Sequence, residues 1–435
     1  MSANDDQLAV FFLDVFVEEA NTKMWSERLT AFLLVAIAAV VTVIFADETV
    51  ETVCKSFGGK SVTTPPTCPP PYRYRHALTP VHTSGTDGAP LLVLYGGFSR
   101  STEPLYPRSD VWLHSTGDAQ WVEQVGDWRE AADAAWEAVP TATYGTGAAQ
   151  PMPRGAHTMI AVPGSAGALL LVAGGVTYPR ADSLETPLRD VWLLNVSSGA
   201  WRVLVRDTGL PERTVFAVEA GAGAGAGAGA SNATLFAFGG LQRDPTGAGA
   251  DTYSSDVYAV RLDDPAATAT VVPPKGAARP PPRAEHTGVY RAGARQLAVF
   301  GGTDGQTARG DLWLLDLASM TWSERVARGL YAPSSRYSHA AALCAGDAAA
   351  GRADLMVVLG GRNRNNYLSD MWVYNFSAPA DDAWVFVTTF GALTAAAVAC
   401  VDSVAYVSSG MVASGDAVAN HLLRIDLAHL PPMRP

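Results

Sequence analysis

Several features that define common protein classes are scarce in this sequence. Its 435 residues include only four cysteines, too few for a disulfide scaffold, so the chain must fold mainly by burying apolar surface. The formal net charge is −11, and no basic patch with interleaved aromatic residues occurs, which argues against a nucleic-acid partner. A phosphate-binding loop, a nucleophile elbow and a paired-carboxylate motif are also missing, so catalysis has no recognisable motif.

Long apolar runs are equally scarce, and the only one spans residues 29–46. Its length lies between that of a membrane-spanning helix and that of a signal-peptide core. Basic residues precede it and acidic residues follow it, which favours a cytosolic N-terminus. We expect 1–28 to be an N-terminal extension, followed by a hydrophobic helix that is either cleaved after Ala46 or kept as a signal anchor. Met24 is an alternative start to Met1.

An internal repeat is present in most of the remaining chain. In each copy an apolar strand ends in Gly-Gly, a variable loop follows, and Asp-x-Trp or Asp-x-Tyr begins another strand. In three copies a second Trp follows the Asp by 11 residues, a count that indicates a fixed hairpin. The five clear copies contain Gly96, Gly97, Asp110, Trp112 and Trp121; Gly174, Gly175, Asp190, Trp192 and Trp201; Gly239, Gly240, Asp256 and Tyr258; Gly301, Gly302, Asp311, Trp313 and Trp322; and Gly360, Gly361, Asp370, Trp372 and Trp384.

A second motif, Arg-x-x-His, precedes four of the Gly-Gly strands. We align Arg213 of the third copy with these arginines, which places Phe216 at the histidine position. We expect the glycines to allow a sharp turn, the Asp to accept hydrogen bonds from loop amides, and the Trp to fill space between neighbouring sheets. Because a residue that recurs once per repeat is usually structural, we predict no metal site and no cofactor. The four pairs are Arg73/His76, Arg154/His157, Arg283/His286 and Arg336/His339.

This set of motifs resembles the kelch repeat over residues 73–428, at the period of about 50 residues that is typical of kelch. The resemblance implies an all-β fold, a six-bladed β-propeller with five clear repeats and one degenerate repeat. The sixth copy has Ser409-Gly410 in place of Gly-Gly. Propellers of this family often close with a strand from the other terminus, so we expect the linker 47–72 to supply a closing strand at 49–56. The alternative is five blades and an irregular tail.

Three segments lie outside the repeat pattern. An inter-blade insertion at 122–153 contains a predicted amphipathic helix at 127–139. The Gly-Ala tract 221–230 is of low complexity. Residues 429–435 form a tail.

The loops of a propeller blade alternate between two faces, and the sequence distinguishes these faces. Three glycosylation sequons, at Asn195, Asn232 and Asn375, fall in loops of one face. The loops between the second and third strands of each blade belong to the other face and are rich in Arg and Tyr, which often anchor interfaces. We predict ligand or partner binding there through Arg100, Tyr106, Arg108, Tyr178, Arg180, Arg243, Tyr253, Arg362, Arg364 and Tyr367.

The four cysteines give one prediction and one open question. Cys54 and Cys68 are close in sequence, and we predict a disulfide between them. Cys344 and Cys400 are either a second disulfide or two buried thiols. A further motif, the integrin-type triplet Arg309-Gly-Asp311, contains the Asp of the repeat, so we interpret it as a coincidence.

We therefore expect a monomeric binding module in the secretory pathway, extracellular or anchored in the membrane through 29–46. It would recognise a protein or a glycan through its strand 2–3 and inter-blade loops, and would not bind nucleic acid. One alternative is a secreted carbohydrate-active or oxidase-like enzyme of the galactose oxidase kind, although no segment matches that copper site. The other alternative is a cytosolic kelch adaptor.

Overall fold

The computed structural model divides the chain into two units, Met1–Cys68 and Pro69–Pro435, and all residues that it describes belong to the second. Within those residues, no helix has the length and apolar character needed to cross a membrane. The described residues are 73–81, 90–99, 106–116, 120–125, 150–162, 169–178, 185–196, 198–219, 233–244, 250–326, 332–346, 352–364, 366–379, 383–389, 392–408, 410–412 and 422–428.

Several predictions fall outside these residues. They are the hydrophobic helix at 29–46, the closing strand at 49–56, the disulfide between Cys54 and Cys68, the helix at 127–139, the Gly-Ala tract 221–230 and the sequon at Asn232.

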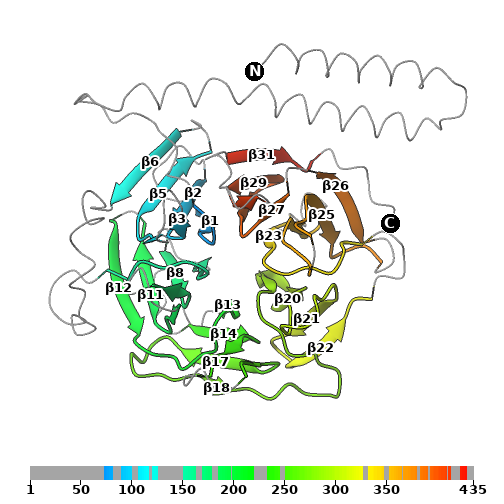
Figure 1. Ribbon diagram of the computed structural model, residues 1–435, viewed down its shortest axis with the longest axis horizontal. Helices are drawn as coiled ribbons and strands as arrows, with labels where there is room; N and C mark the ends of the chain where they lie inside the picture. The colour runs from blue at the N-terminus through cyan, green and yellow to red at the C-terminus, as the bar shows by residue number, and fades with distance from the viewer. Residues whose placement is uncertain are drawn as a thin grey trace, which may run out of the picture. The chain divides into compact units, whose positions relative to one another are not determined.

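Six antiparallel sheets surround a central axis (Figure 1), which confirms the six-bladed propeller over five blades and a tail. The first strand of each blade is innermost and the last is outermost. The first blade contains β1 (Ala77–Val81), β2 (Leu91–Tyr95), β5 (Val111–Ser115) and β6 (Gln120–Val125); the second β7 (Thr158–Ala161), β8 (Leu169–Ala173), β11 (Val191–Asn195) and β12 (Ala200–Val205); and the third β13 (Val215–Glu219), β14 (Thr234–Phe238), β17 (Val257–Arg261) and β18 (Thr270–Val271).

The fourth and fifth blades follow the same order, whereas the sixth has three described strands. The fourth contains β19 (Thr287–Arg291), β20 (Gln296–Phe300), β21 (Leu312–Asp316) and β22 (Thr321–Glu324); the fifth β23 (Ala340–Cys344), β24 (Leu355–Leu359), β25 (Asp370–Asn375) and β26 (Trp384–Thr389); and the sixth β28 (Ala397–Val401), β29 (Val404–Ser408) and β31 (Leu422–Asp426). Short hairpins extend the strand 2–3 loops of three blades, as β3 (Phe98–Ser99) with β4 (Tyr106–Pro107), β9 (Val176–Thr177) with β10 (Thr186–Pro187), and β15 (Leu241–Gln242) with β16 (Thr252–Tyr253); in the sixth blade β27 (Leu393–Thr394) pairs with β30 (Met411–Val412).

The Gly-Gly pairs lie at the end of the second strand of each blade, where other segments of the propeller approach the backbone closely. Gly96 and Gly97 have φ angles of 65° and 96°, in the left-handed region that favours glycine. A Cβ on Gly96 would lie 2.6 Å from the Arg154 carbonyl oxygen, and one on Gly97 would lie 2.8 Å from the His76 Cβ. Gly96 therefore permits the close approach of the second blade, and Gly97 permits that of the segment before β1 in its own blade.

A buried ion pair connects the two sequence motifs within a blade. In the second blade Arg154 is fully buried, and its two terminal nitrogens donate to the two carboxylate oxygens of Asp190 at 2.7 and 2.9 Å. The Trp192 indole N–H donates to the same carboxylate at 2.6 Å. A guanidinium and an indole thus hold this Asp, rather than the loop amides expected from the sequence. The same arrangement occurs in Arg73–Asp110–Trp112, Arg283–Asp311–Trp313 and Arg336–Asp370–Trp372.

The third blade departs from this arrangement, and the structure corrects its alignment. Glu212 pairs with Leu241 as Tyr74 pairs with Phe98, so Pro211 occupies the position of the buried arginine. The sequence alignment, which set Arg213 at the position of Arg73 and Phe216 at that of the histidine, is therefore wrong. Arg213 corresponds to Arg75, and Thr214 occupies the histidine position. Without the buried arginine opposite it, Asp256 is exposed to solvent.

Aromatic side chains pack between neighbouring blades, as predicted. The ring of Tyr95 in the first blade lies 5.1 Å from Trp201 in the second, and Phe238 lies 4.8 Å from Trp322 of the next blade. Phe300 contacts Trp384 in the same way at 5.2 Å. These pairs bury large flat surfaces at the blade junctions, within apolar clusters that combine residues of adjacent blades.

Candidate functional site at the mouth of the channel

The innermost strands of all six blades line a central channel with a volume of about 430 Å³. At one end of the channel, each blade contributes the residue that lies two positions before its first strand. These residues have φ angles of 51–56°, a left-handed conformation that is uncommon for residues other than glycine. We call these residues the axial ring: Arg75, Ala156, Arg213, Glu285, Ser338 and Ala395.

Main-chain hydrogen bonds run from blade to blade through much of the axial ring. Ala156 donates to Arg75, Arg75 to Ala395, Ala395 to Ser338, and Ser338 to Glu285, at 2.8–3.0 Å. These bonds fix the unusual backbone and hold the ring side chains at the mouth. The site is therefore built on the rigid centre of the propeller.

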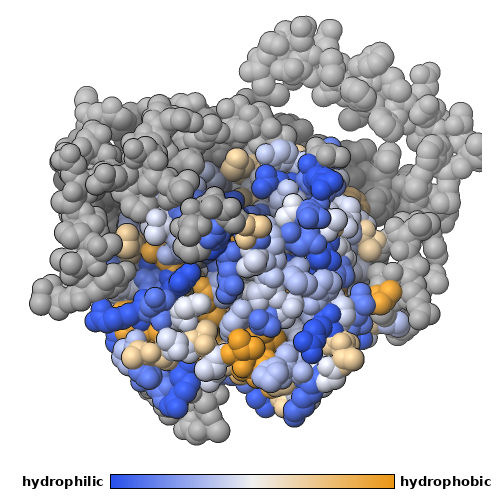
Figure 2. All heavy atoms as spheres, turned by 60° about the horizontal axis from the view of Figure 1, so that its bottom comes forward, coloured by the Kyte–Doolittle hydropathy of each residue, from blue (hydrophilic) through white to orange (hydrophobic). Residues whose placement is uncertain are grey.

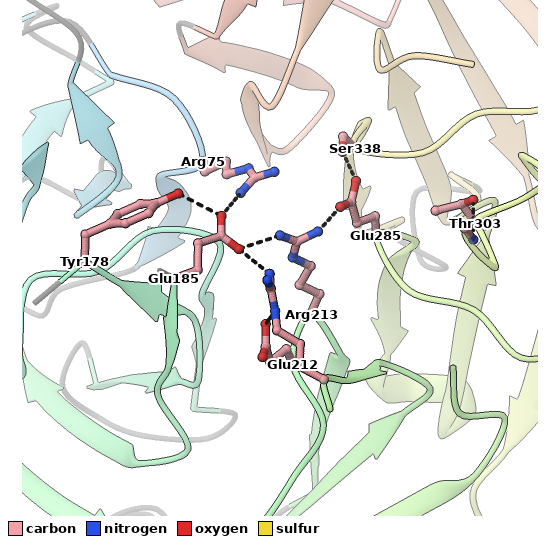
Figure 3. A network of polar contacts seen from close by, with 10 residues as sticks. Arg75, Tyr178, Glu185, Glu212, Arg213, Glu285, Thr303 and Ser338 are labelled. Atoms are coloured by element: carbon pink, nitrogen blue, oxygen red, sulfur yellow. Dashed lines mark hydrogen bonds and ion pairs between the residues drawn. The ribbon is translucent and has the colours of Figure 1, made fainter. Parts of the chain in front are cut away.

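Glu185 is the centre of a network of polar contacts at this mouth (Figure 3). It lies just before β10, in the strand 2–3 loop of the second blade. Its carboxylate accepts hydrogen bonds from Arg75 at 3.2 Å, from the Tyr178 hydroxyl at 2.9 Å and from Arg213 at 2.8 Å. Arg243 also donates to it. One carboxylate therefore links the first, second and third blades.

The network continues into the fourth and fifth blades. Arg213 forms an ion pair with Glu285, and Glu285 accepts a hydrogen bond from the Ser338 hydroxyl. Arg243 also pairs with Glu212 at 3.0 Å. Three guanidinium groups are thus balanced by three carboxylates. The mouth is dense in hydrogen-bonding groups yet close to neutral in charge.

The surroundings set the ionisation of these groups. Burial raises the pKa of the Glu185 carboxyl, but the charges of Arg213 and Arg75 outweigh this effect and hold the pKa below its usual value. For Glu212 burial dominates, and the pKa is raised. Burial and the adjacent Glu185 raise the pKa of Tyr178 to about 12, so its hydroxyl remains a donor at neutral pH.

The structure brings together two of the binding residues predicted from the sequence, Tyr178 and Arg243. Arg362 lies nearby on the fifth blade, with its guanidinium carbon 4.8 Å from the centre of the Tyr337 ring. The remaining predicted residues are spread around the rim. Arg108, Tyr253 and Tyr367 are half-buried, Arg364 is exposed, Arg100 and Arg180 lie outside the described residues, and Tyr106 is in β4 but its side chain is outside the description.

Most residues of the network were not among the predicted ones. Glu185 lies in the same loop as Tyr178 and Arg180, and no sequence motif marks it. Arg75, Glu285 and Ser338 occupy the second variable position of Arg-x-x-His. Both variable positions of the motif differ among blades while the flanking Arg and His recur in four of them, and this variation is the signal that could have identified the axial ring.

The repeated histidines are structural in their contacts. His157 packs edge-on against Tyr95 with ring centres 5.0 Å apart, and His339 contacts the Thr287 hydroxyl at 2.7 Å. Burial, and then the neighbouring Arg73, lower the pKa of His76 to about 3. Among the described residues, no three His, Cys, Asp or Glu side chains are arranged to hold a metal ion.

The integrin-type triplet at Arg309-Gly-Asp311 is also engaged in the fold. The Asp311 carboxylate accepts two hydrogen bonds from Arg283 and one from Trp313, each at 2.7 Å. Arg309 pairs with Asp304 at 2.7 Å. Both charged groups of the triplet thus have internal partners.

The opposite end of the channel has a different polar group. Glu219 accepts hydrogen bonds from Tyr290 at 3.0 Å and from Arg295 at 2.9 Å. The sequon residues Asn195 and Asn375 end the third strands of their blades and so lie on this face. Each accepts a main-chain hydrogen bond through its side-chain oxygen, from Ser198 and Ser377 respectively.

Apolar side chains are sparse on the described surface. Figure 2 shows hydrophilic residues interspersed with small hydrophobic patches. Among the residues that the structure describes, the large apolar side chains that are mainly exposed are Val271 and Val326, at 55% and 53%. Recognition of a partner by the described surface must therefore rely on polar groups and aromatic edges more than on a broad apolar patch.

Comparison with known proteins gives a family-model match over the second half of the chain and two partial matches to longer proteins. Residues 225–430 match the family model described as the KLHDC2/KLHL20/DRC7 Kelch-repeats domain. Host cell factor of Drosophila melanogaster is 35% identical over 119 residues, which is 25% of this chain and 8% of that protein. Multiple epidermal growth factor-like domains protein 8 of Mus musculus is 26% identical over 371 residues, which is 82% of this chain and 11% of that protein.

This chain thus spans about a tenth of the length of these relatives. The six blades and the matched kelch repeats suggest a protein-binding module. The matched repeats and the six blades support a kelch-repeat β-propeller.

Proposed function

We propose that this propeller captures a protein partner at the face that carries the axial ring and the strand 2–3 loops. The observation that carries the proposal is the Glu185 network, in which loops and ring residues of several blades converge on one mouth. Such a network presents many oriented donors and acceptors without requiring the ring to rearrange. Preorganised groups reduce the entropy lost on binding and favour specificity.

The charge balance of the mouth predicts how the affinity for a partner should depend on salt concentration. Because Arg75, Arg213 and Arg243 already have carboxylate partners, a partner gains little from long-range attraction there. Affinity should then change only weakly with salt concentration. Arg362 and Arg364 on the rim supply the charged contacts that remain.

We further propose that the protein matures in the secretory pathway. The apolar run 29–46 supports targeting. A disulfide between Cys344 and Cys400 supports an oxidising compartment. The sequons at Asn195 and Asn375 support glycosylation of the face opposite the mouth, which would leave the axial ring uncovered.

The binding proposal is tested with paired variants at the two ends of the channel. Arg75→Ala/Arg213→Ala removes mouth contacts, and Glu219→Ala/Arg295→Ala removes a comparable ionic group at the other end. Tagged protein is incubated with cell surfaces, crosslinked, and the captured proteins are quantified by mass spectrometry. Partners should be lost with the mouth variant and kept with the opposite-end variant.

The outcomes are distinct for each ligand class. Equal capture by both variants would place the binding surface elsewhere. Capture that disappears after glycosidase treatment of the cells would assign the ligand as a glycan instead of a protein. Changing Arg362, Arg364 and Tyr367 together to Ala tests the rim in the same assay, with an unchanged melting temperature as the control.

The compartment is tested by expression with a C-terminal tag in a eukaryotic secretory host. A glycosidase-sensitive band in the medium would indicate a cleaved signal, and the same band in carbonate-resistant membranes would indicate an anchor. An unmodified cytosolic band would contradict the proposal and favour the adaptor alternative.

A further inference from the structure

A disulfide joins the innermost strands of the fifth and sixth blades. It connects Cys344 at the end of β23 with Cys400 in β28, with Cα atoms 5.0 Å apart. Both cysteines are buried, at 2% and 7% exposure, in an apolar cluster that the two blades share. The sequence left open whether these cysteines were bridged, and the structure gives a covalent link between adjacent blades.

The bridge lies at the end of these strands away from the mouth. At the mouth end, the Ala395 amide and the Thr394 hydroxyl both donate to the Ser338 carbonyl oxygen, at 3.0 and 3.1 Å. The two strands belong to different sheets, so no ladder of hydrogen bonds joins them between these points. Leu393 adds two main-chain bonds near the mouth, because its amide donates to the Leu368 carbonyl oxygen at 3.0 Å and its carbonyl oxygen accepts from the Gly361 amide at 2.7 Å. Side-chain packing along the strands, these hydrogen bonds at the mouth end and the disulfide at the far end therefore hold the fifth and sixth blades together.

The sixth blade has three described strands, and the last of these, β31, is only partly buried. On its other side it meets the first blade, where Ser408 contacts the His76 ring at 2.9 Å and Ala395 accepts from the Arg75 amide. The last blade thus closes the circle, and it carries one member of the axial ring.

We propose that the Cys344–Cys400 disulfide is an oxidative clasp that closes the propeller ring. It forms when the two thiols reduce a disulfide-bearing oxidant, which leaves as two thiols while the Cys344 and Cys400 sulfurs become bonded. Without the clasp, the sixth blade opens locally before the rest of the fold. Because Ala395 moves with it, the mouth loses a fixed neighbour of Ser338 and Arg75.

Hydrogen exchange measured by mass spectrometry on the full chain tests the clasp. The variant Cys344→Ser/Cys400→Ser is compared with Cys54→Ser/Cys68→Ser, which removes the same number of cysteines and leaves the clasp intact. We expect amide exchange in 397–426 to rise about tenfold or more in the first variant, because it frees a cross-link that spans 56 residues. Exchange in β8, β14 and β20 should stay unchanged.

Reduction of the wild-type protein provides a second measurement that does not depend on a substitution. A small dithiol should increase exchange in 397–426 in the wild type and have no further effect on the Cys344→Ser/Cys400→Ser variant. Equal exchange in oxidised and reduced protein would overturn the clasp. So would free Cys344 and Cys400 thiols in folded, purified protein.

The effect on the mouth rests on the proposed function and is measured separately. Loss of captured partner on reduction, together with faster exchange in 397–426, supports coupling of the clasp to the mouth. Faster exchange with unchanged capture would overturn that coupling and leave ring closure in place. Capture that fails in oxidised wild-type protein would contradict the proposed function alone, because the exchange comparison needs no partner.

Discussion

The buried Arg154–Asp190 pair should be among the most sensitive points of the fold. Arg154 is fully buried, and its guanidinium donates two hydrogen bonds to Asp190, one to the Gly174 carbonyl and one to the Met152 carbonyl, among its contacts. The substitution Asp190→Asn removes the balancing charge and leaves the guanidinium in place. Breaking a buried pair by removing one partner destabilises a protein by about 3–5 kcal/mol. That is a large part of the roughly 5–15 kcal/mol that stabilises a typical domain.

The third blade supplies a matched control for this substitution. Asp256 occupies the same position in its repeat, but it is exposed and has Pro211 in place of the arginine. The change Asp256→Asn should therefore alter the free energy of unfolding by no more than about 0.5 kcal/mol. Identical chemistry at two equivalent positions separates the effect of the ion pair from the effect of the side-chain change.

The assay is denaturant unfolding of both variants and the wild type, followed by tryptophan fluorescence. Asp190→Asn should lower the midpoint strongly, and Asp256→Asn should not. The double change Arg154→Met/Asp190→Leu should recover part of the loss, because replacing both charges removes the unpaired guanidinium. If Asp190→Asn lowered the free energy of unfolding no more than Asp256→Asn does, the buried ion pair would not be the stabilising contact inferred here.

Other predictions concern pH, the network and metal content. Burial, and then the nearby arginine, lower the pKa of both His76 and His286 to about 3. Below the ordinary histidine pKa of about 6.5, these histidines therefore bind protons in the unfolded chain but not in the folded one. Stability should be constant above pH 7 and fall below about pH 6.5 by roughly 1.4 kcal/mol per pH unit for each such histidine; a flat profile in denaturation between about pH 7.5 and 5 would contradict this. Glu185→Gln should reduce partner capture with a small change in melting temperature, whereas Tyr178→Phe should reduce capture less, because it removes one of several donors; equal capture by all three proteins would count against the network. Elemental analysis of the purified protein should find no stoichiometric copper or iron, and finding either would favour the enzyme alternative.

Much of the fold could be predicted because each blade repeats its constraints. Gly-Gly, the Asp-x-Trp motif and the later Trp are local requirements of one hairpin and one junction, and they recur at fixed spacing. The pairing of Arg154 with Asp190 could not be read directly, because 36 residues separate the two. The third blade was misaligned because Arg213 matches the residue type of Arg73 but not its register.

The site was harder to predict than the fold because its residues come from different blades. Glu185 meets Arg75 across 110 positions and Arg213 across 28, and only the closing of the ring brings them together. Residue type did point to Tyr178 and Arg243, which lie in loops at the mouth and take part in the Glu185 network. It did not indicate that the arginines would be neutralised by carboxylates from neighbouring loops, which changes the expected recognition from charge attraction to oriented hydrogen bonding.

Binding of a protein partner at the mouth is tested most directly by comparing partner capture between variants of the two ends of the channel. Wild type, Arg75→Ala/Arg213→Ala and Glu219→Ala/Arg295→Ala are crosslinked to the same cell surfaces, and the captured proteins are quantified. Arg75→Ala/Arg213→Ala should lose the partners that the other two proteins retain. Retention by the mouth variant, with loss by the opposite-end variant, would contradict this prediction.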